Sequence, residues 1–297
     1  MAPLIPLMLA VMFGGCHPEG REARRELDSC QEGDAQSCND IALRFLGGRY
    51  VLRDEARAAS LFDLACEEGV AESCVRLGVM HLEGTGVDED TAGAARLYER
   101  ACDGGALEGC SRLGVLYRDS IAVPADQPRA VALFEQACDG GFAEGCAHAG
   151  YALVVGRGAD RSAARAAALF EKACAGDSPL GCVGLGTLHA AGEGAALNVE
   201  RAAELYEKAC DADEAAGCFH LADLHEHGNG VERNFERAAE LYRTACNLGS
   251  GRGCYGLAIL HQNGTGVPRR VEHAASLIQR ACDMGHTPAC AAVTEAT

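Results

Sequence analysis

The feature that most constrains the fold is a strict cysteine repeat. Eight cysteines stand 36 residues apart, and each is followed eight residues later by a second cysteine. The pairs are Cys30 and Cys38, Cys66 and Cys74, Cys102 and Cys110, Cys138 and Cys146, Cys174 and Cys182, Cys210 and Cys218, Cys246 and Cys254, and Cys282 and Cys290. No insertion or deletion interrupts the series. A fixed period of this length is typical of a solenoid, in which repeats bury their apolar faces against their neighbours.

Each period contains two helical patterns. Before the first cysteine, apolar residues recur at i, i+3, i+4 and i+7, as in residues 202–210 (AAELYEKAC), which predicts an amphipathic helix that we name helix B. After the second cysteine, as in residues 74–81, leucines flank a small residue in helix A, and the small residue lets a neighbouring helix approach closely. A glycine three residues past the first cysteine, such as Gly69, ends helix B, and a Gly-x-Gly turn ends helix A. Asp or Asn precedes many B helices as an expected N-cap: Asp54, Asp90, Asp126, Asn198 and Asn234.

These patterns predict an all-α solenoid over residues 16–297. We expect about seven full helix pairs from about Ala35 to Gly285, a leading B-type helix over about residues 19–31, and a short final helix A that begins near Pro288. Two turns, at residues 47–50 and 119–122, lack the Gly-x-Gly and are expected to differ in shape.

The paired cysteines are predicted to form disulfides. Seven intervening residues allow the end of helix B to face the start of helix A at a Cα separation of about 5.5 Å. Each bridge would contribute about 2–3 kcal/mol in the chain-entropy model. Metal binding and free thiols are the alternatives, but neighbouring pairs are about 10 Å apart, too far for four thiolates to share one ion. We expect no cofactor and no metal site.

The N-terminal segment indicates export. The apolar run from Leu4 to Phe13 is too short to span a bilayer, and it leads to residues 13–16 (FGGC). This resembles a bacterial lipoprotein signal, in which residues 1–15 are removed and Cys16 is lipidated. The prediction is a lipoprotein of the cell envelope or periplasm; simple secretion, or a cytosolic protein with a wrongly assigned start, are the alternatives. The formal net charge of −17 argues against nucleic acid and anionic membrane surfaces as partners, so membrane contact is expected only through the lipid.

The repeat motifs resemble a known family. The AAELYEKAC block, the Leu-Gly-x-Leu-Tyr/His block and the Gly-x-Gly-Val turn look like Sel-1-like repeats, relatives of the tetratricopeptide repeat. The period and the paired cysteines resemble the cysteine-rich, Helicobacter cysteine-rich protein type, over about residues 20–295. The resemblance implies a right-handed, disulfide-stapled α-solenoid of αα-hairpins with secreted or periplasmic address and protein-binding roles. We expect a monomer.

The resemblance also indicates where a protein or peptide ligand would bind. In tetratricopeptide-type solenoids helix A lines the concave groove, and the residues one, two and five positions after the second cysteine vary most between repeats here. The candidate groove residues are Val75, Arg76, Val79, Arg112, Val115, His148, Tyr151, Phe219, His220, Asp223, Tyr255 and Ile259. A solvated face without a ligand is the alternative.

Catalytic motifs are missing from the sequence. Some members of the family carry a β-lactamase or penicillin-binding label, which leaves a β-lactamase-like or cell-wall-peptide-binding protein as the alternative function. However, no serine has a lysine three positions on, and no His-x-His-x-Asp-His occurs. We therefore predict no catalytic residues and no enzyme.

Histidines recur at one position of helix A, at His81, His189, His225 and His261. The prediction is a ring packed between helices with its polar edge hydrogen-bonded, and a metal-binding or pH-sensing pair of His225 and His261 is the alternative.

Overall fold

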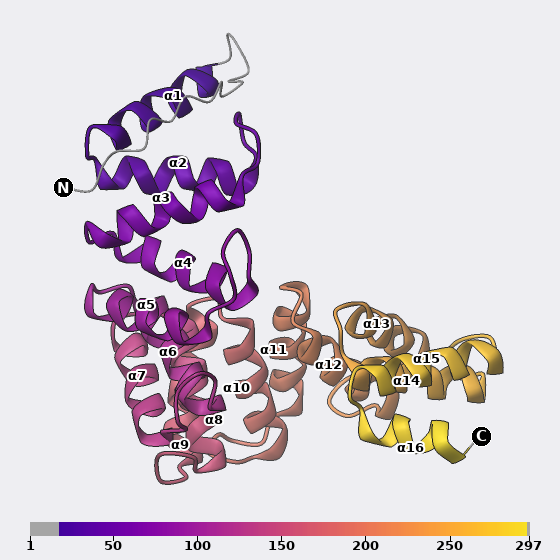
Figure 1. Cartoon of the computed structure of the whole chain (residues 1–297). Coiled ribbons are helices and arrows are strands. Elements are labelled where there is room, and N and C mark those ends of the chain that lie inside the picture. The colour runs from indigo at the N-terminus through magenta and orange to yellow at the C-terminus, as the bar shows by residue number, and fades with distance from the viewer. Residues whose placement is uncertain (1–17, 296–297) are drawn as a thin grey trace. The chain divides into compact units, whose positions relative to one another are not determined.

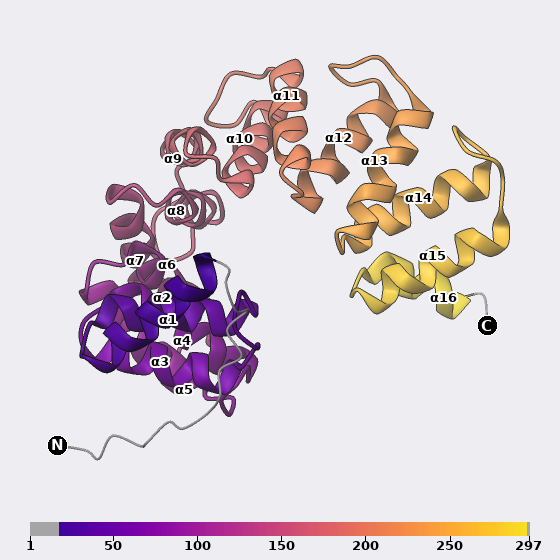
Figure 2. The same ribbon diagram turned by 90° about the horizontal axis from the view of Figure 1, so that it is seen from above.

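The computed structural model describes residues 18–295 and contains sixteen helices there (Figures 1 and 2). Their bounds are α1 (Pro18–Gln31), α2 (Ala35–Gly47), α3 (Glu55–Glu67), α4 (Ala71–Glu83), α5 (Thr91–Asp103), α6 (Leu107–Asp119), α7 (Gln127–Asp139), α8 (Ala143–Val155), α9 (Ala163–Ala175), α10 (Pro179–Ala191), α11 (Val199–Asp211), α12 (Ala215–His227), α13 (Phe235–Asn247), α14 (Gly251–Asn263), α15 (Val271–Asp283) and α16 (Thr287–Glu295). The all-α prediction is confirmed. No helix of the described residues is long and apolar enough to cross a bilayer.

The chain divides into two compact units, which we describe separately. Unit 1 extends to Leu133 and unit 2 begins at Phe134, within α7. Odd-numbered helices are the predicted B helices and even-numbered helices are the A helices. Successive A helices contact one another, α4 with α6 in unit 1, and α8 with α10, α10 with α12 and α12 with α14 in unit 2. The A helices α4 and α6 in unit 1, and α8 to α14 in unit 2, therefore form rows, and we call the surface formed by the A helices of a unit its A-face.

The predicted caps form as the sequence indicates. The side chains of Asp54 and Asn198 accept hydrogen bonds from backbone N–H groups in the first turn of α3 and α11, and Asp90, Asp126 and Asn234 do the same. Gly69 ends its B helix at a φ of 96°, the left-handed conformation that glycine adopts without a steric cost. Local sequence thus sets both ends of the B helices.

The second glycine of each Gly-x-Gly turn supports a contact between repeats. A Cβ on Gly194, whose φ is 70°, would lie 2.3 Å from the backbone carbonyl of Ala163 at the start of α9. Tyr50 and Ala122 occupy the same position in turns without this glycine, yet their φ values are 62° and 61°. The expectation that these turns differ in shape is therefore wrong. The backbone at this position is left-handed whether or not the residue is glycine.

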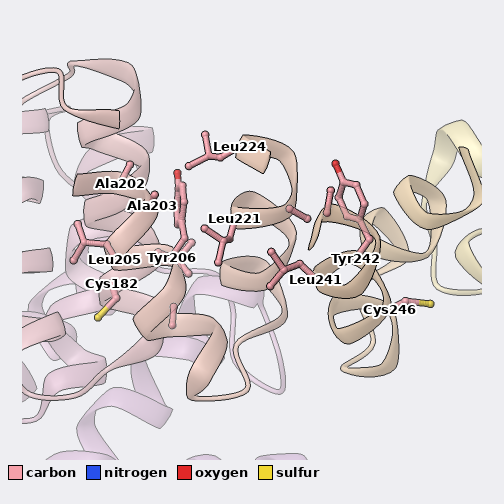
Figure 3. Packing of buried hydrophobic residues seen from close by; sticks show 14 of the residues in the cluster. Cys182, Ala202, Ala203, Leu205, Tyr206, Leu221, Leu224, Leu241, Tyr242 and Cys246 are labelled. Carbon is pink, nitrogen blue, oxygen red and sulfur yellow. The ribbon is translucent and has the colours of Figure 1, made fainter. Parts of the chain in front are cut away.

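Each B helix from α3 to α13 inserts one aromatic ring into the core, whereas α1 and α15 have no Phe or Tyr. Tyr98 in unit 1 is fully buried, and Tyr206 and Tyr242 are almost fully buried in unit 2. Figure 3 shows Tyr206 beside Leu221 and Leu224 of α12. The predicted small residues make room for these rings, since a Cβ on Gly186 would come within 2.8 Å of the Tyr206 ring.

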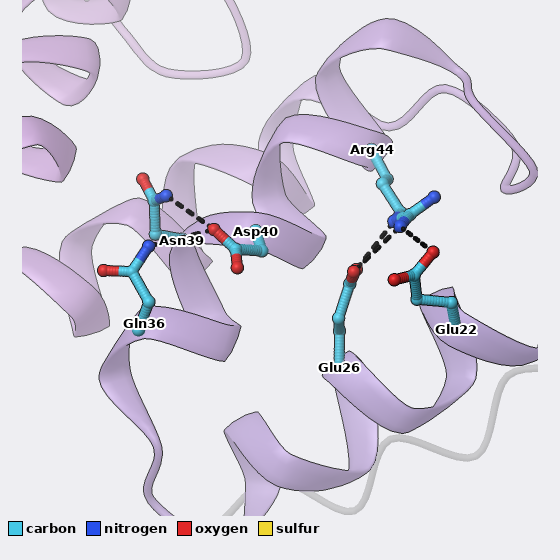
Figure 4. A network of polar contacts seen from close by, with 6 residues as sticks. All are labelled: Glu22, Glu26, Gln36, Asn39, Asp40 and Arg44. Atoms are coloured by element: carbon cyan, nitrogen blue, oxygen red, sulfur yellow. Dashed lines mark hydrogen bonds and ion pairs between the residues drawn. The ribbon is translucent and has the colours of Figure 1, made fainter. Parts of the chain in front are cut away.

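Polar contacts attach some of the helices to the helix or repeat before them. Arg44 on α2 forms ion pairs with Glu26 at 2.6 Å and Glu22 at 3.1 Å on α1 (Figure 4), and the hydrogen bond to Glu26 raises the pKa of Arg44. In unit 2, the Lys208 ammonium donates to the carbonyl of Cys174 at 2.9 Å. A cation at the exposed carbonyls of a helix C-terminus is stabilising.

Candidate binding surface

Disulfides position the start of every A helix. All eight predicted pairs are bridged, from Cys30–Cys38 to Cys282–Cys290, with Cα separations of 4.5 to 4.8 Å. The predicted pairing is thus present, and the alternatives of free thiols and metal do not apply to these cysteines. Each bridge fixes the first turn of helix A, directly before the first two candidate groove positions. Cys16 lies outside the described residues.

In unit 1 the A-face offers little apolar surface. Val75 is only 4% exposed and packs in the core with Ala94 and Tyr98, so the prediction that it lines a groove is wrong. Val79 and Val115 are half-buried. Arg76 and Arg112 are exposed, and Arg112 donates to Glu108 at 2.7 Å.

In unit 2 the candidate residues all lie at the surface without being fully exposed. Those of α8 are His148 and Tyr151, those of α12 are Phe219, His220 and Asp223, and those of α14 are Tyr255 and Ile259; all are half-buried. The structure brings the rings of Phe219 and His220 within 5.2 Å of each other. Tyr151 packs edge-on against Phe170, at 4.8 Å. All seven side chains lie on A helices and are neither buried nor fully exposed.

The second position after the cysteine lies over the aromatic ring of the preceding B helix. His220 stacks on Tyr206, with ring centroids 5.0 Å apart and an interplanar angle of 21°, and His148 lies 4.9 Å from Phe134. Where glycine takes this position, the ring occupies the space instead, since a Cβ on Gly184 would lie 2.5 Å from Phe170. The aromatic core thus supports the A-face from below.

The hydroxyls of three tyrosines of unit 2, two in the core and one at the A-face, are bonded within the fold. Tyr242 donates to Glu226 at 2.7 Å, Tyr206 to Thr187 at 3.3 Å, and Tyr151 to the carbonyl of Leu180 at 3.3 Å. Burial raises the pKa of Tyr151 to about 12, and burial followed by the hydrogen bond to Glu226 raises the pKa of Tyr242. These phenols therefore stay protonated at neutral pH.

Sequence reasoning missed two residues of this surface. The guanidinium carbon of Arg252 lies 4.1 Å from the centroid of the Phe219 ring, and His286 lies 5.1 Å from Tyr255. Burial, and then the charge of Arg252, lower the pKa of His220, against a smaller opposing effect of Asp223. The sequence could have pointed to Arg252, because a positive charge replaces the glutamate that three other repeats have at this helix position. These glutamates are Glu72, Glu108 and Glu144.

The recurring histidines contact the turns that follow their helices. In each of His81, His189, His225 and His261, Nδ1 lies 2.9 to 3.3 Å from the backbone carbonyl seven residues later, in the turn that ends helix A. The prediction of packed rings with a bonded polar edge is confirmed. Residues 18–295 contain no group of three or more side chains arranged to hold a metal ion.

Comparison with known proteins identifies the repeats. The Sel1 repeat matches seven consecutive segments, at residues 35–70, 71–105, 107–142, 143–178, 179–214, 215–250 and 251–286. No curated protein matches the sequence significantly.

Solved structures share the fold. A Sel1 repeat protein from Oxalobacter formigenes has a TM-score of 0.72 at 17% identity, over 82% of this chain and 96% of that one. A protective antigen of uropathogenic Escherichia coli, which displays an SLR fold, has a TM-score of 0.70 at 24% identity. The match covers 90% of this chain but only 57% of the antigen. An immunity protein from Pseudomonas aeruginosa has a TM-score of 0.54 at 18% identity, over 73% and 82% of the two chains. At these identities the similarity concerns the fold alone.

Proposed function

Because this chain belongs to the Sel1 repeat family, we propose that it is an exported scaffold that binds a protein or peptide on the A-face of unit 2. The observation that carries the proposal is the group of half-buried rings on α12 and α14, Phe219, His220 and Tyr255. Aromatic side chains at the surface, supported from below by a packed core, are typical of the residues that dominate binding energy at interfaces. The helix pairs and bridges hold these rings in place before a partner arrives, which lowers the entropic cost of binding.

The proposed role is binding without catalysis. The matched family is a repeat family rather than a catalytic one, and burial raises the pKa values of Tyr151, Tyr206 and Tyr242, which keeps these phenols protonated. A turnover assay with β-lactams and cell-wall peptides, on metal-free and metal-loaded protein, checks this part of the proposal. Turnover above the buffer rate would contradict it.

The disulfides indicate the compartment of the protein, and its attachment to a membrane is a further proposal. Eight disulfides indicate an oxidising, extracytoplasmic compartment. We further propose that residues 1–15 are a lipoprotein-type signal and that Cys16 carries the lipid. The intact mass of native protein without reductant tests this, because it should show cleavage before Cys16, an added diacylglycerol group and the loss of two hydrogens per bridge. A full-length mass with free thiols would overturn both parts.

The binding proposal is tested by capture from native cell envelope. The disulfide-bonded protein is compared with a variant carrying Phe219→Ala and Tyr255→Ala and with a control carrying Val79→Ala and Val115→Ala on the A-face of unit 1. We expect a saturable partner that is lost with the first variant and retained with the control. Thermal unfolding of each variant verifies that the fold persists. Equal capture by all three proteins, or none above an unrelated solenoid, would contradict the proposal.

A further inference from the structure

One corner of the A-face of unit 2 carries a positive charge that the fold does not use. Arg252 lies in the first turn of α14, is exposed, and covers the ring of Phe219 on α12 at 4.1 Å. Within residues 18–295, the structure shows no ion pair between Arg252 and a carboxylate, as is also the case for Arg243 of unit 2, whereas Arg165 and Arg201 are paired with glutamates. We call Phe219, His220, Arg252, Tyr255 and His286 the Arg252 patch.

Helix stability does not explain an arginine here. The first turn of a helix favours acidic side chains, and a cation there is unfavourable. The equivalent position of α4, α6 and α8 accordingly has glutamate, at Glu72, Glu108 and Glu144. The exception at α14 coincides with the one place on this face where a phenylalanine ring lies under the guanidinium, which orients the planar group while leaving its N–H donors available.

The other charged groups around the patch define its polarity. Burial and then Arg252 lower the pKa values of both His220 and His286, which keeps the two imidazoles neutral at pH 7. Asp223, one turn further along α12, raises the pKa of His220 through its charge, and Glu226 accepts a hydrogen bond from Tyr242. The patch thus has a single cation at its α14 end and carboxylates towards the far end of α12.

From this arrangement we propose that the Arg252 patch binds a peptide segment with one carboxylate beside an aromatic or aliphatic side chain. The carboxylate accepts hydrogen bonds from Arg252, and its apolar neighbour packs on Phe219 and Tyr255. A second carboxylate towards Asp223 is disfavoured by repulsion. The large negative net charge of the protein matters less than Arg252 at this distance, because physiological salt screens charges beyond about 8 Å. This inference rests on the proposed function and specifies its partner class.

The test uses short synthetic peptides with the full, disulfide-bonded protein. The probe is acetyl-Gly-Phe-Glu-Phe-Gly-amide, and its matched control has Gln in place of Glu. Isothermal titration calorimetry should show the Glu peptide binding about tenfold tighter than the Gln peptide, the gain expected for a charge-assisted hydrogen bond. Arg252→Gln should abolish this preference, and Arg76→Gln on α4, an exposed arginine of unit 1, should leave it unchanged.

Each other outcome has a distinct meaning. Equal binding of both peptides that is lost in Phe219→Ala/Tyr255→Ala would overturn the carboxylate proposal and leave the binding surface in place. A preference for Glu that needs Arg252 but survives loss of both rings would overturn the apolar part of the proposal and the proposed binding face. Failure of the Glu peptide to bind, while envelope capture still depends on Phe219 and Tyr255, would overturn the carboxylate proposal alone.

Discussion

Units 1 and 2 are built from the same helix pairs and the same bridges, yet their A-faces differ. In unit 1 the position directly after the second cysteine is buried: Val75 lies in the core, and Asn39 accepts a hydrogen bond from Ser73 of the next repeat at 3.0 Å. In unit 2 the last two repeats place Phe219 and Tyr255 there, and both rings are half-buried. The same position is also core at Ala147 and Val183 of unit 2, so it becomes surface only in the two repeats whose side chain is too large to be enclosed.

The turns differ between the units as well. Unit 2 has glycine at the second left-handed position of its turns, as at Gly194 and Gly266. Unit 1 has glycine there at Gly86 but has Tyr50 and Ala122 in its other two turns, with the same backbone conformation. The scaffold therefore fixes the turn, and the residue present determines how much strain the turn holds. The predictions below use these two differences.

The largest effect is expected from a turn of unit 2. Gly194→Ala should lower the free energy of unfolding by about 3 kcal/mol, because the new Cβ adds left-handed strain and overlaps the backbone of Ala163. Chemical denaturation monitored by circular dichroism measures this. The matched control is Gly249→Ala, where φ is also positive but nothing lies within 4 Å of the new Cβ, so only the strain is added. Equal losses for both variants would show that the contact between turn and helix is unimportant.

Bridge removal should affect the two units alike. Replacing both cysteines by alanine, either Cys66 and Cys74 in unit 1 or Cys246 and Cys254 in unit 2, should cost about 2.5 kcal/mol in each case, because the closed loops have the same length. Denaturation midpoints of the two double variants provide the comparison. A loss confined to one unit would mean that the bridges are not equivalent parts of a uniform scaffold.

A substitution in a turn of unit 1 should raise the stability of the protein. Ala122→Gly should stabilise the protein by about 1 kcal/mol, since it removes a side chain from a left-handed backbone at φ 61°. The same denaturation assay applies, with Ala125→Gly in the same turn region as a control that should not stabilise. A destabilised Ala122→Gly variant would contradict the strain described for unit 1.

How far the sequence predicts this molecule depends on the range of the interaction. Caps, C-terminal glycines, bridges and helix bounds follow from residues within one period, and these predictions hold. Burial of Val75 and the contact of Arg252 with Phe219 join side chains from different helices, and variation between repeats does not distinguish a small core residue from an exposed one. The prediction for the turns at Tyr50 and Ala122 was wrong because these two residues adopt the left-handed backbone that the sequence reserves for glycine in the other turns.

The smallest expected effect is a pH dependence of the free energy of unfolding that arises from His220 in unit 2. Because the native pKa of His220 lies below its ordinary value of about 6.5, the unfolded chain binds a proton before the native protein does. The free energy of unfolding should be level above about pH 6.5 and should fall as the pH drops from there to the native pKa. His220→Phe, which keeps a ring over Tyr206, should weaken this dependence. Superimposable pH profiles of the two proteins would contradict the assignment.

The central claim is that the partner contacts the A-face of unit 2 and not that of unit 1. A photo-crosslinking amino acid placed at position 259 on α14 or at position 79 on α4 tests it directly, because both are the fifth residue after a bridged cysteine and both native side chains are half-buried. Irradiation of cells that carry each variant should give a discrete crosslinked product from position 259 and none from position 79. A product from position 79 alone, or the same product from both, would contradict the account.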